Sequence, residues 1–405
     1  MPRSSRATSS HVQPTRKHSE RKPKPFVGCS RRMRIAREIK AVSPCRILRL
    51  NFVSLCEAPF RAGCFNSIDM SDTHVSLRAQ LDRFPRLPLA AYPTPLHRLP
   101  RLSEQLQRPI YLKRDDEIGP GGGGNKTRKL EYLLAKAQQR GARRVATFGG
   151  LQSNHARLTA AAARRIGMEP HLFYFERKPP RLAGNLFLNE LFGAKMHFIP
   201  FGGGGDAGMT LETTIRLVHL IAWLRIGPHT FIPVGGHSWR GCLGYVRAAL
   251  ELDEQARALG IDNAHVVMAA GSGGTLAGLI AGLYLIGSAL RPLGIDVGRL
   301  WKGFPVSIAR LASELCTRLN QPHTFTAAEI PLIVDTYVGS RYAAPTDQCL
   351  AAIRRLARSE GVILDPVYTG KAFAGLIDLV ERRQLGRDEP IIFLHTGGLP
   401  ALFAS

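Results

Sequence analysis

Cysteine is scarce in this chain, with seven residues among 405. So sparse a set excludes a small disulfide-stabilised scaffold. Neither a Cys-x-x-Cys pair nor a Cys/His ligand spacing occurs, so a structural zinc site has no support. We therefore expect reduced thiols, a cytoplasmic location and no bound metal ion.

Long uninterrupted apolar runs are also missing. The apolar stretch at residues 47–52 is broken by Arg49 and Asn51, and it is too short for a secretory signal. Residues 266–290 carry no charge and could span a bilayer by length. Because glycines interrupt them at 271–274, we expect a strand, a glycine loop and a buried helix instead of a membrane segment.

Acidic residues are few, and the chain carries a net charge of +24. Residues 1–69 hold 15 Lys and Arg against four Asp and Glu, so nearly half of the excess lies in this stretch. The rest is spread thinly, without the basic runs and interleaved aromatics of single-strand binding. A basic, non-enzymatic nucleic-acid-binding protein, with a steep salt dependence, stays only a remote alternative.

Residues 1–69 lack helical or strand periodicity and contain four of the seven cysteines. We expect a disordered or non-native extension, with the natural start at Met70. A transit peptide is the rival interpretation, because the stretch is rich in Arg and Ser and poor in acids.

From about residue 110 onward, short apolar runs alternate with helical patterns. The length exceeds the ~250–300 residues at which a single core stops growing, so two domains are expected. Strands are predicted at residues 145–148, 171–175, 196–199, 230–234, 266–270, 332–334 and 391–394. A helix is predicted over residues 125–140, with an apolar stripe and a terminating glycine at 141. This alternation predicts an α/β fold with mostly parallel sheets and helices on both faces.

Two glycine-rich segments each lie directly before a predicted helix. In Gly-Ser-Gly-Gly-Thr at 271–275, converging backbone N–H groups and the helix dipole would form a phosphate site, with Ser272 and Thr275 as further donors. The segment lacks the P-loop lysine and fits GxGxxG poorly, so neither ATP nor NAD is favoured. A tight strand–helix connection without a ligand is the alternative.

The other segment, four glycines at 121–124, places Lys126 in the first turn of the following helix. The partial positive charge there lowers the pKa of a lysine and favours the nucleophilic amine that Schiff-base chemistry needs. A solvated lysine on the helix shoulder is the other interpretation, and it fits Arg128 and Lys129 better.

Polar residues follow two further predicted strands. After residue 148, Ser153 or Asn154 can cap the next helix, or free N–H groups there can hold a substrate carboxylate. The last strand ends in His395-Thr396-Gly-Gly, which places a hydroxyl at the carboxyl edge of the sheet, where open α/β sheets bind ligands.

Five motifs together resemble one family. GGGNKTRKLEYLL, LQSNHARLTAAAA, AAGSGGTLAGL, LDPVYTGKAFAGL and FLHTGGLPALF are similar to the D-cysteine desulfhydrase and 1-aminocyclopropane-1-carboxylate deaminase family of fold type II, pyridoxal-phosphate-dependent enzymes. The likeness covers about residues 75–405. It implies a large cofactor-binding domain (70–128 with 240–405), a small domain (129–239) and a homodimer.

The resemblance also implies roles for individual residues. Lys126 would carry the cofactor covalently. The further cofactor-binding residues would be Asn154 at the phenolic oxygen, Thr396 at the ring nitrogen, Thr369, and the phosphate-binding Gly271, Ser272, Gly273, Gly274 and Thr275. The substrate carboxylate would lie among Ser153, Asn154 and His155. Tyr342 and Tyr368 would lie near the reacting carbon, and Lys126, Ser153 and both tyrosines would be catalytic.

The implied reaction is α,β-elimination of D-cysteine to pyruvate, ammonia and hydrogen sulfide. Lys126 would take the Cα proton, and a tyrosine hydroxyl would assist the departing hydrosulfide. His155 and Thr369 match the desulfhydrase branch, because the deaminase branch has Gln and Glu there. We expect a neutral hydroxyl environment at Thr369 to suffice for expelling a thiolate. A deaminase, or a β-elimination lyase for another small amino acid, is the alternative.

Two segments depart from the family. His237-Ser-Trp-Arg240 replaces smaller and less basic residues, and residues 294–308, with Trp301, also fit poorly. Neither segment contains a residue assigned to catalysis.

Overall fold

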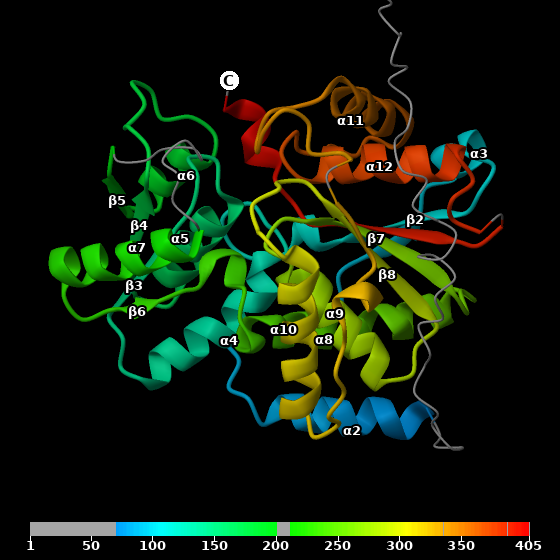
Figure 1. The fold of residues 1–405 in the computed structure, drawn as a ribbon, viewed down its shortest axis with the longest axis horizontal. Coiled ribbons are helices and arrows are strands. Elements are labelled where there is room, and N and C mark those ends of the chain that lie inside the picture. Colours follow the sequence, from blue (N-terminus) through cyan, green and yellow to red (C-terminus); the bar gives the residue numbers. More distant parts are fainter. Residues whose placement is uncertain (1–69, 201–210, 335, 387, 405) are drawn as a thin grey trace, which may run out of the picture. The chain divides into compact units, whose positions relative to one another are not determined.

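The computed structural model describes residues 70–200, 211–334, 336–386 and 388–404 (Figure 1). All of them belong to the compact unit Asn51–Ser405. The extension predicted for residues 1–69 lies outside the described residues, so its character stays a prediction.

The larger of two sheets has six strands in the order β1-β2-β10-β7-β8-β9. They are β1 (Leu96–Arg98), β2 (Ile110–Arg114), β10 (Ile391–His395), β7 (Ala264–Ala270), β8 (Leu290–Asp296) and β9 (Leu332–Ile333). The pair β1–β2 is antiparallel, and every other pair in this sheet is parallel.

Helices cover both faces of the larger sheet (Figure 1). The alternation of side chains along β7 explains the two layers, because Val266 and Met268 belong to one apolar cluster and Val267 and Ala269 to another. The first face is covered by α8 (Trp239–Ala258), α9 (Gly274–Leu285) and α10 (Phe304–Arg318), with α2 (Met70–Asp82) packed outside α8. The second is covered by α3 (Pro100–Gln105), α11 (Asp347–Glu360) and α12 (Thr369–Glu381).

The smaller sheet has four parallel strands in the order β5-β4-β3-β6. They are β5 (Lys195–Phe198), β4 (Glu169–Tyr174), β3 (Arg144–Phe148) and β6 (Thr230–Phe231). On one face lie α4 (Lys126–Gln139), α5 (Asn154–Arg165) and α6 (Asn185–Leu191), and on the other lies α7 (Leu211–Ile226). Short 3-10 helices are η1 (Asp115–Glu117), η3 (Val234–Gly236), η4 (Ala327–Glu329) and η5 (Leu399–Phe403).

The predicted α/β class with mostly parallel sheets is confirmed. The division at residues 128/129 and 239/240 agrees with the strands that each sheet contains, but it stays a prediction. Within the described part of the chain, no helix is long and apolar enough to cross a membrane. The uncharged stretch 266–290 instead forms most of β7, then a glycine loop and α9.

Strand β8 is absent from the sequence prediction because Pro292 and Gly294 interrupt its apolar pattern. The structure tolerates the proline for a local reason. β8 pairs with β7 along its whole length, whereas β9 reaches only Gly294 and Ile295. Pro292 therefore lies where β8 has one neighbour, and its missing N–H breaks no pairing with β9.

Candidate functional site

A cavity of about 870 Å³ lies at the carboxyl ends of β3, β7 and β10, between loops that follow strands of both sheets. Its lining contains most of the residues predicted from sequence: Lys126, Ser153, Asn154, His155, Gly271, Ser272, Gly273, Thr275, Tyr342, Tyr368 and Thr396. Gly274 and Thr369 do not line it. The structure therefore brings together, at the carboxyl ends of strands from both sheets, side chains from segments far apart in sequence.

Lys126 is the first residue of α4, and its Nζ donates to Asn125 Oδ1 at 2.9 Å. Burial lowers the pKa of this lysine well below its ordinary value, and the neighbouring Lys129 charge lowers it further, against the opposing effect of Asp365. The sequence prediction of a lowered pKa invoked the helix dipole, whereas the enclosure of the amine dominates here.

The glycine run before Lys126 is held from the facing helix. Arg157 of α5 donates through Nη1 to the Gly121 carbonyl and through Nη2 to the Gly123 carbonyl, the second at 3.0 Å. Gly123 has φ +70°, and a Cβ there would lie 1.9 Å from the Asp116 carbonyl oxygen. Only glycine fits this position, and the run thereby delivers Lys126 to the cavity.

Lys129 is buried, which contradicts the interpretation of this residue as a solvated lysine on the helix shoulder. It lies three residues after Lys126, on the same face of α4, and donates to the Gly235 carbonyl at 3.0 Å. Burial lowers its pKa to about 8. The i, i+3 spacing from Lys126 could have revealed it in the sequence.

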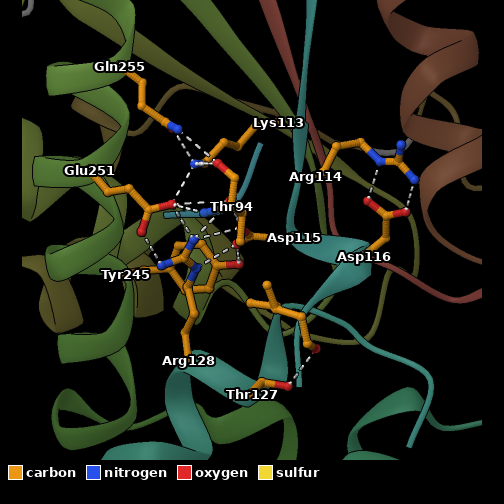
Figure 2. A network of polar contacts seen from close by, with 11 residues as sticks. Thr94, Lys113, Arg114, Asp115, Asp116, Thr127, Arg128, Tyr245, Glu251 and Gln255 are labelled. Carbon is orange, nitrogen blue, oxygen red and sulfur yellow. Dashed lines mark hydrogen bonds and ion pairs between the residues drawn. The ribbon is translucent and has the colours of Figure 1, made fainter. Parts of the chain in front are cut away.

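Arg128 is also buried, and it anchors the first turn of α4 (Figure 2). Its guanidinium donates to Asp115 at 2.8 and 2.9 Å and to Glu251 of α8 at 2.9 Å. Lys113 of β2 donates to the same Glu251 at 2.5 Å, and the Tyr245 hydroxyl donates to Asp115 at 2.6 Å. This network ties the helix that carries Lys126 to the larger sheet and to α8.

The loop at residues 271–275 leads from β7 into α9. Gly273 lies in the left-handed region with φ +76°, and no side chain caps α9. The N–H groups of this turn are therefore left for a ligand. Thr275 Oγ1 accepts from Asn125 Nδ2 at 3.0 Å, which links the loop to the residue beside Lys126.

Two buried cations of the site have no carboxylate partner: Lys129, which lies beside the loop 271–275, and Arg157, which lies at the glycine run 121–124. Within the described residues, neither Lys129 nor Arg157 forms an ion pair. Lys129 Nζ lies 3.0 Å from the position that a Cβ on Gly274 would take. A buried charge without a counter-ion is costly, so an anion at this loop would relieve a penalty that the fold carries.

The segment after β3 supplies hydrogen-bond donors to the opposite side of the cavity. Ser153 caps α5 by accepting from Ala156 N at 3.2 Å, so the capping interpretation holds for Ser153. Asn154 Oδ1 accepts from Asn185 Nδ2 at 3.0 Å, which leaves the amide N–H groups of Asn154 as donors.

His155 is neutral and has a defined tautomer. Burial lowers its pKa well below 6.5, with further lowering by Lys126. The Thr147 hydroxyl gives its hydrogen to the Ile232 carbonyl at 2.8 Å, so His155 Nε2 donates to that hydroxyl at 2.9 Å. Nδ1 therefore carries no hydrogen to offer a carboxylate. The donors that this segment offers to a carboxylate are the Ser153 hydroxyl, the Asn154 amide and backbone N–H groups.

Two tyrosines form a pair at the cavity wall. The hydroxyls of Tyr342 and Tyr368 share a hydrogen bond, and the ring centroids are 6.1 Å apart. Burial raises the pKa of Tyr342 to about 12, and it raises the pKa of Tyr368 well above its ordinary value. Both phenols thus keep their protons at neutral pH. One O–H is used within the pair, and the other remains to donate to a ligand.

Thr369 lies behind the tyrosine pair, in contact with a carboxylate. Its hydroxyl donates to Asp365 Oδ1 at 2.7 Å and accepts from Asp365 N at 2.9 Å. Asp365 also accepts from the N–H groups of Val367, Tyr368 and Thr369 at 2.8–2.9 Å. A buried carboxylate therefore lies beside Thr369, and Asp365 fixes the turn that carries Tyr368. That a neutral hydroxyl at Thr369 suffices for expelling a thiolate stays a prediction.

The sequence prediction did not include Asn125, Lys129, Arg157 or Asp365. A signal existed for Arg157, which follows Asn154 by three residues and so lies on the same face of α5. Asp365 and Asn125 had a weaker signal, since both lie inside motifs that the sequence singles out.

Comparisons with known proteins agree with the predicted family. The sequence pattern of the family described as "Pyridoxal-phosphate dependent enzyme" matches residues 87–397. A D-cysteine desulfhydrase from Salmonella schwarzengrund is 40% identical over 332 residues, covering 80% of this chain and 97% of the relative. Among solved structures, an ACC deaminase homologue has a TM-score of 0.71 at 38% identity, over 81% of this chain and 96% of that chain. Threonine deaminase isoform 2 from Solanum lycopersicum, at 17% identity and a TM-score of 0.54 over 82% of this chain and 85% of that chain, shares the fold.

Proposed function

Because the chain belongs to the family of pyridoxal-phosphate dependent enzymes, we propose that it is a carbon–sulfur lyase that eliminates hydrosulfide from D-cysteine and releases pyruvate and ammonia. One observation carries the chemistry: an enclosed lysine amine and a pair of protonated tyrosines line the same cavity. The choice of D-cysteine is supported by the 40% identity to proteins named D-cysteine desulfhydrase.

The residues present fit the cofactor. Its phosphate would be held by the N–H groups at 271–275 and by the α9 dipole, with the Lys129 charge behind them. Its aldehyde would attach to Lys126, its phenolic oxygen would accept from Asn154, and Thr396 would meet the ring nitrogen. The Thr369 hydroxyl is engaged by Asp365, so we assign Thr369 to supporting the Tyr368 turn. When bound, pyridoxal phosphate supplies a conjugated ring that accepts the charge left at Cα.

The chain's own groups then perform the proton transfers. Ser153 and the α5 N-terminus hold the substrate carboxylate and thereby orient the Cα–H bond. The neutral amine of Lys126 accepts the Cα proton, because burial and Lys129 keep it from being protonated beforehand. The tyrosine whose hydroxyl is not used within the pair donates its proton to the leaving hydrosulfide.

The decisive experiment concerns Lys126. We expect Lys126→Ala to abolish turnover, since it removes the attachment point and the base together. Borohydride reduction of the full chain should fix the cofactor on the peptide that contains Lys126. Lys136→Ala, at the exposed end of the same helix, should leave turnover unchanged. Fixation on Lys129 or Lys371 would contradict the assignment.

A deaminase is the second candidate, supported by the 38% identity to an ACC deaminase homologue. Release of the 2-oxo acid should be compared for four substrates: D-cysteine, L-cysteine and β-chloro-D-alanine, which give pyruvate, and 1-aminocyclopropane-1-carboxylate, which gives 2-oxobutanoate. We expect the two D-configured substrates to be preferred. Faster release from the cyclopropane would favour the deaminase.

We also propose a cytoplasmic homodimer. The three cysteines of the described residues, Cys242, Cys316 and Cys349, are buried free thiols, which suits a reducing compartment. The dimer is supported by family resemblance, and light scattering of the purified chain tests it.

A further inference from the structure

Two segments that depart from the resembled family meet at the loop 271–275. The Trp301 indole N–H donates to the Gly271 carbonyl at 3.1 Å. The His237 ring packs against Trp301, with centroids 5.3 Å apart and an angle of 32° between the planes. His237 Nε2 in turn bonds Ser307 Oγ at 3.1 Å. Trp301, His237 and Ser307 thus form one series of side-chain contacts that ends at the loop, which we call the bracket.

The bracket contacts the loop through backbone groups. The Gly271 carbonyl and the Ser272 N–H belong to one planar trans peptide and point in opposite directions. Fixing the carbonyl to Trp301 therefore also fixes the direction of the Ser272 N–H. The Ser272 backbone faces His237 as well and raises its pKa, although burial and the Lys129 charge lower that pKa to about 4 overall. The imidazole is consequently uncharged at neutral pH.

The first turn of α10 supports the same loop from behind. A Cβ on Gly273 would lie 2.7 Å from Ile308 Cγ1 and 2.9 Å from Phe304 Cε2. The loop is thus confined on this side, whereas Gly271, Ser272 and Gly273 line the cavity on the other. A glycine-rich loop loses much conformational entropy when it becomes ordered, so ordering it beforehand favours any ligand of its N–H groups.

We propose that Trp301 and His237 are positioning residues that hold the Gly271–Ser272 peptide in place before the cofactor binds, so that its N–H is aimed at the cofactor phosphate. The inference rests on the proposed function, in which this loop holds the phosphate. The proposal gives a role to residues 237–240 and 294–308, the two segments that have no role in the elimination reaction. The role concerns the phosphate end of the cofactor and leaves the ring and Lys126 unaffected.

The test compares two ligands that differ only in the phosphate. The full chain, freed of cofactor with hydroxylamine, is titrated with pyridoxal 5'-phosphate and with pyridoxal, and the dissociation constants are read from visible absorption. Trp301→Phe keeps an aromatic ring against His237 but removes the N–H. We expect it to weaken pyridoxal 5'-phosphate binding about fivefold, as for one ordinary hydrogen bond, with pyridoxal binding unchanged. Trp239→Phe, on the neighbouring α8, is the matched control and should change neither constant.

Each result decides the matter. Equal weakening of both ligands by Trp301→Phe, or no change in either, overturns the bracket while the loop assignment stands. Wild-type chain that binds pyridoxal as tightly as the phosphorylated form overturns the loop assignment itself, and the bracket with it. If Trp301→Phe does not fold, Ser307→Ala decides instead, since it removes only the hydroxyl partner of His237. It should lower the preference for the phosphorylated ligand about twofold, and an unchanged preference would refute the proposal.

Discussion

At the scale of single residues, the site contains three basic side chains. Lys126 lines the cavity, Lys129 contacts Gly235 of its lining, and Arg157 holds the glycine run before Lys126. Burial lowers the pKa of each of them. Asp365 is the carboxylate that opposes this effect at Lys126. The surroundings of Lys126 thus keep its amine uncharged, and the charge of Lys129 contributes to this lowering of its pKa.

Lys129→Met should therefore make Lys126 harder to deprotonate. The Lys129 charge lowers the pKa of Lys126, so its removal raises that pKa toward the ordinary value. Attachment of an aldehyde needs the neutral amine, and its midpoint should move to higher pH by roughly half a unit or more. Pyridoxal is the suitable probe, because it lacks the phosphate that Lys129 also faces. Lys129→Arg keeps the charge and serves as the control, and an unshifted midpoint in Lys129→Met would refute the coupling.

His155 provides a second residue-scale prediction. Its Nδ1 carries no hydrogen, so the side chain should not hold the substrate carboxylate. We expect His155→Ala to raise KM for D-cysteine by less than Ser153→Ala does, because Ser153 presents a hydroxyl to the carboxylate. Steady-state kinetics of the two variants, with folding checked by circular dichroism, make the comparison. A larger KM effect for His155→Ala would assign the carboxylate to the imidazole.

At the scale of elements, the network around Arg128 joins β2, α4 and α8. Glu251 is its centre on the α8 side. Burial alone would raise the pKa of Glu251, but Arg128 and Lys113 outweigh burial and lower it to about 2. Since the folded-state pKa lies below the unfolded value of 4.5, this group stabilises the fold fully above about pH 4.5 and loses its effect as the pH falls toward 2.

Glu251→Gln should lower the free energy of unfolding at neutral pH by about 3 kcal/mol, because it leaves two buried cations with one carboxylate fewer. Between about pH 5 and pH 3, the wild-type chain should lose about 2 kcal/mol of stability through Glu251, and Glu251→Gln should lack this loss. Urea unfolding at both pH values tests this. Glu254→Gln, half-exposed on the same helix, should keep the wild-type loss. The same acid sensitivity in Glu251→Gln and wild type would contradict the assigned role.

The elements that the sequence predicts well are those with a local cause. The glycine loops, the first turn of α4 and the cap at Ser153 follow from rules that involve a few neighbouring residues. β8 and the Arg128 network do not, because their stability comes from partners distant in sequence. Pro292 is tolerated by the short reach of β9, and Arg128 is buried only because Asp115 and Glu251 meet it in the folded chain. The same distinction applies to the site. Its loops follow from local rules and could be predicted from the sequence. The burial of Lys129 and Arg157 could not, because in the sequence they resemble surface charges.

At the scale of the whole molecule, the family match covers residues 87–397, and the described elements begin at Met70. We expect residues 70–405 to fold, to bind cofactor and to turn over D-cysteine with the kcat and KM of the full chain. Absorption spectra and kinetics of the two proteins, purified in parallel, test this. A shortened chain that aggregates or loses cofactor would assign a structural role to residues 1–69.

The uncompensated charge of Lys129 beside the loop 271–275 affects the amount of protein that a cell maintains. A ligand that binds only the folded chain stabilises it by about 4 kcal/mol at a thousand times its dissociation constant. Newly made chains that have not yet acquired their anion bear the full cost of the buried Lys129 charge, so they unfold more often and are degraded first. Vitamin B6 supply would then set the steady-state abundance of this protein together with its synthesis rate, and starvation for the vitamin would deplete the polypeptide as well as its activity.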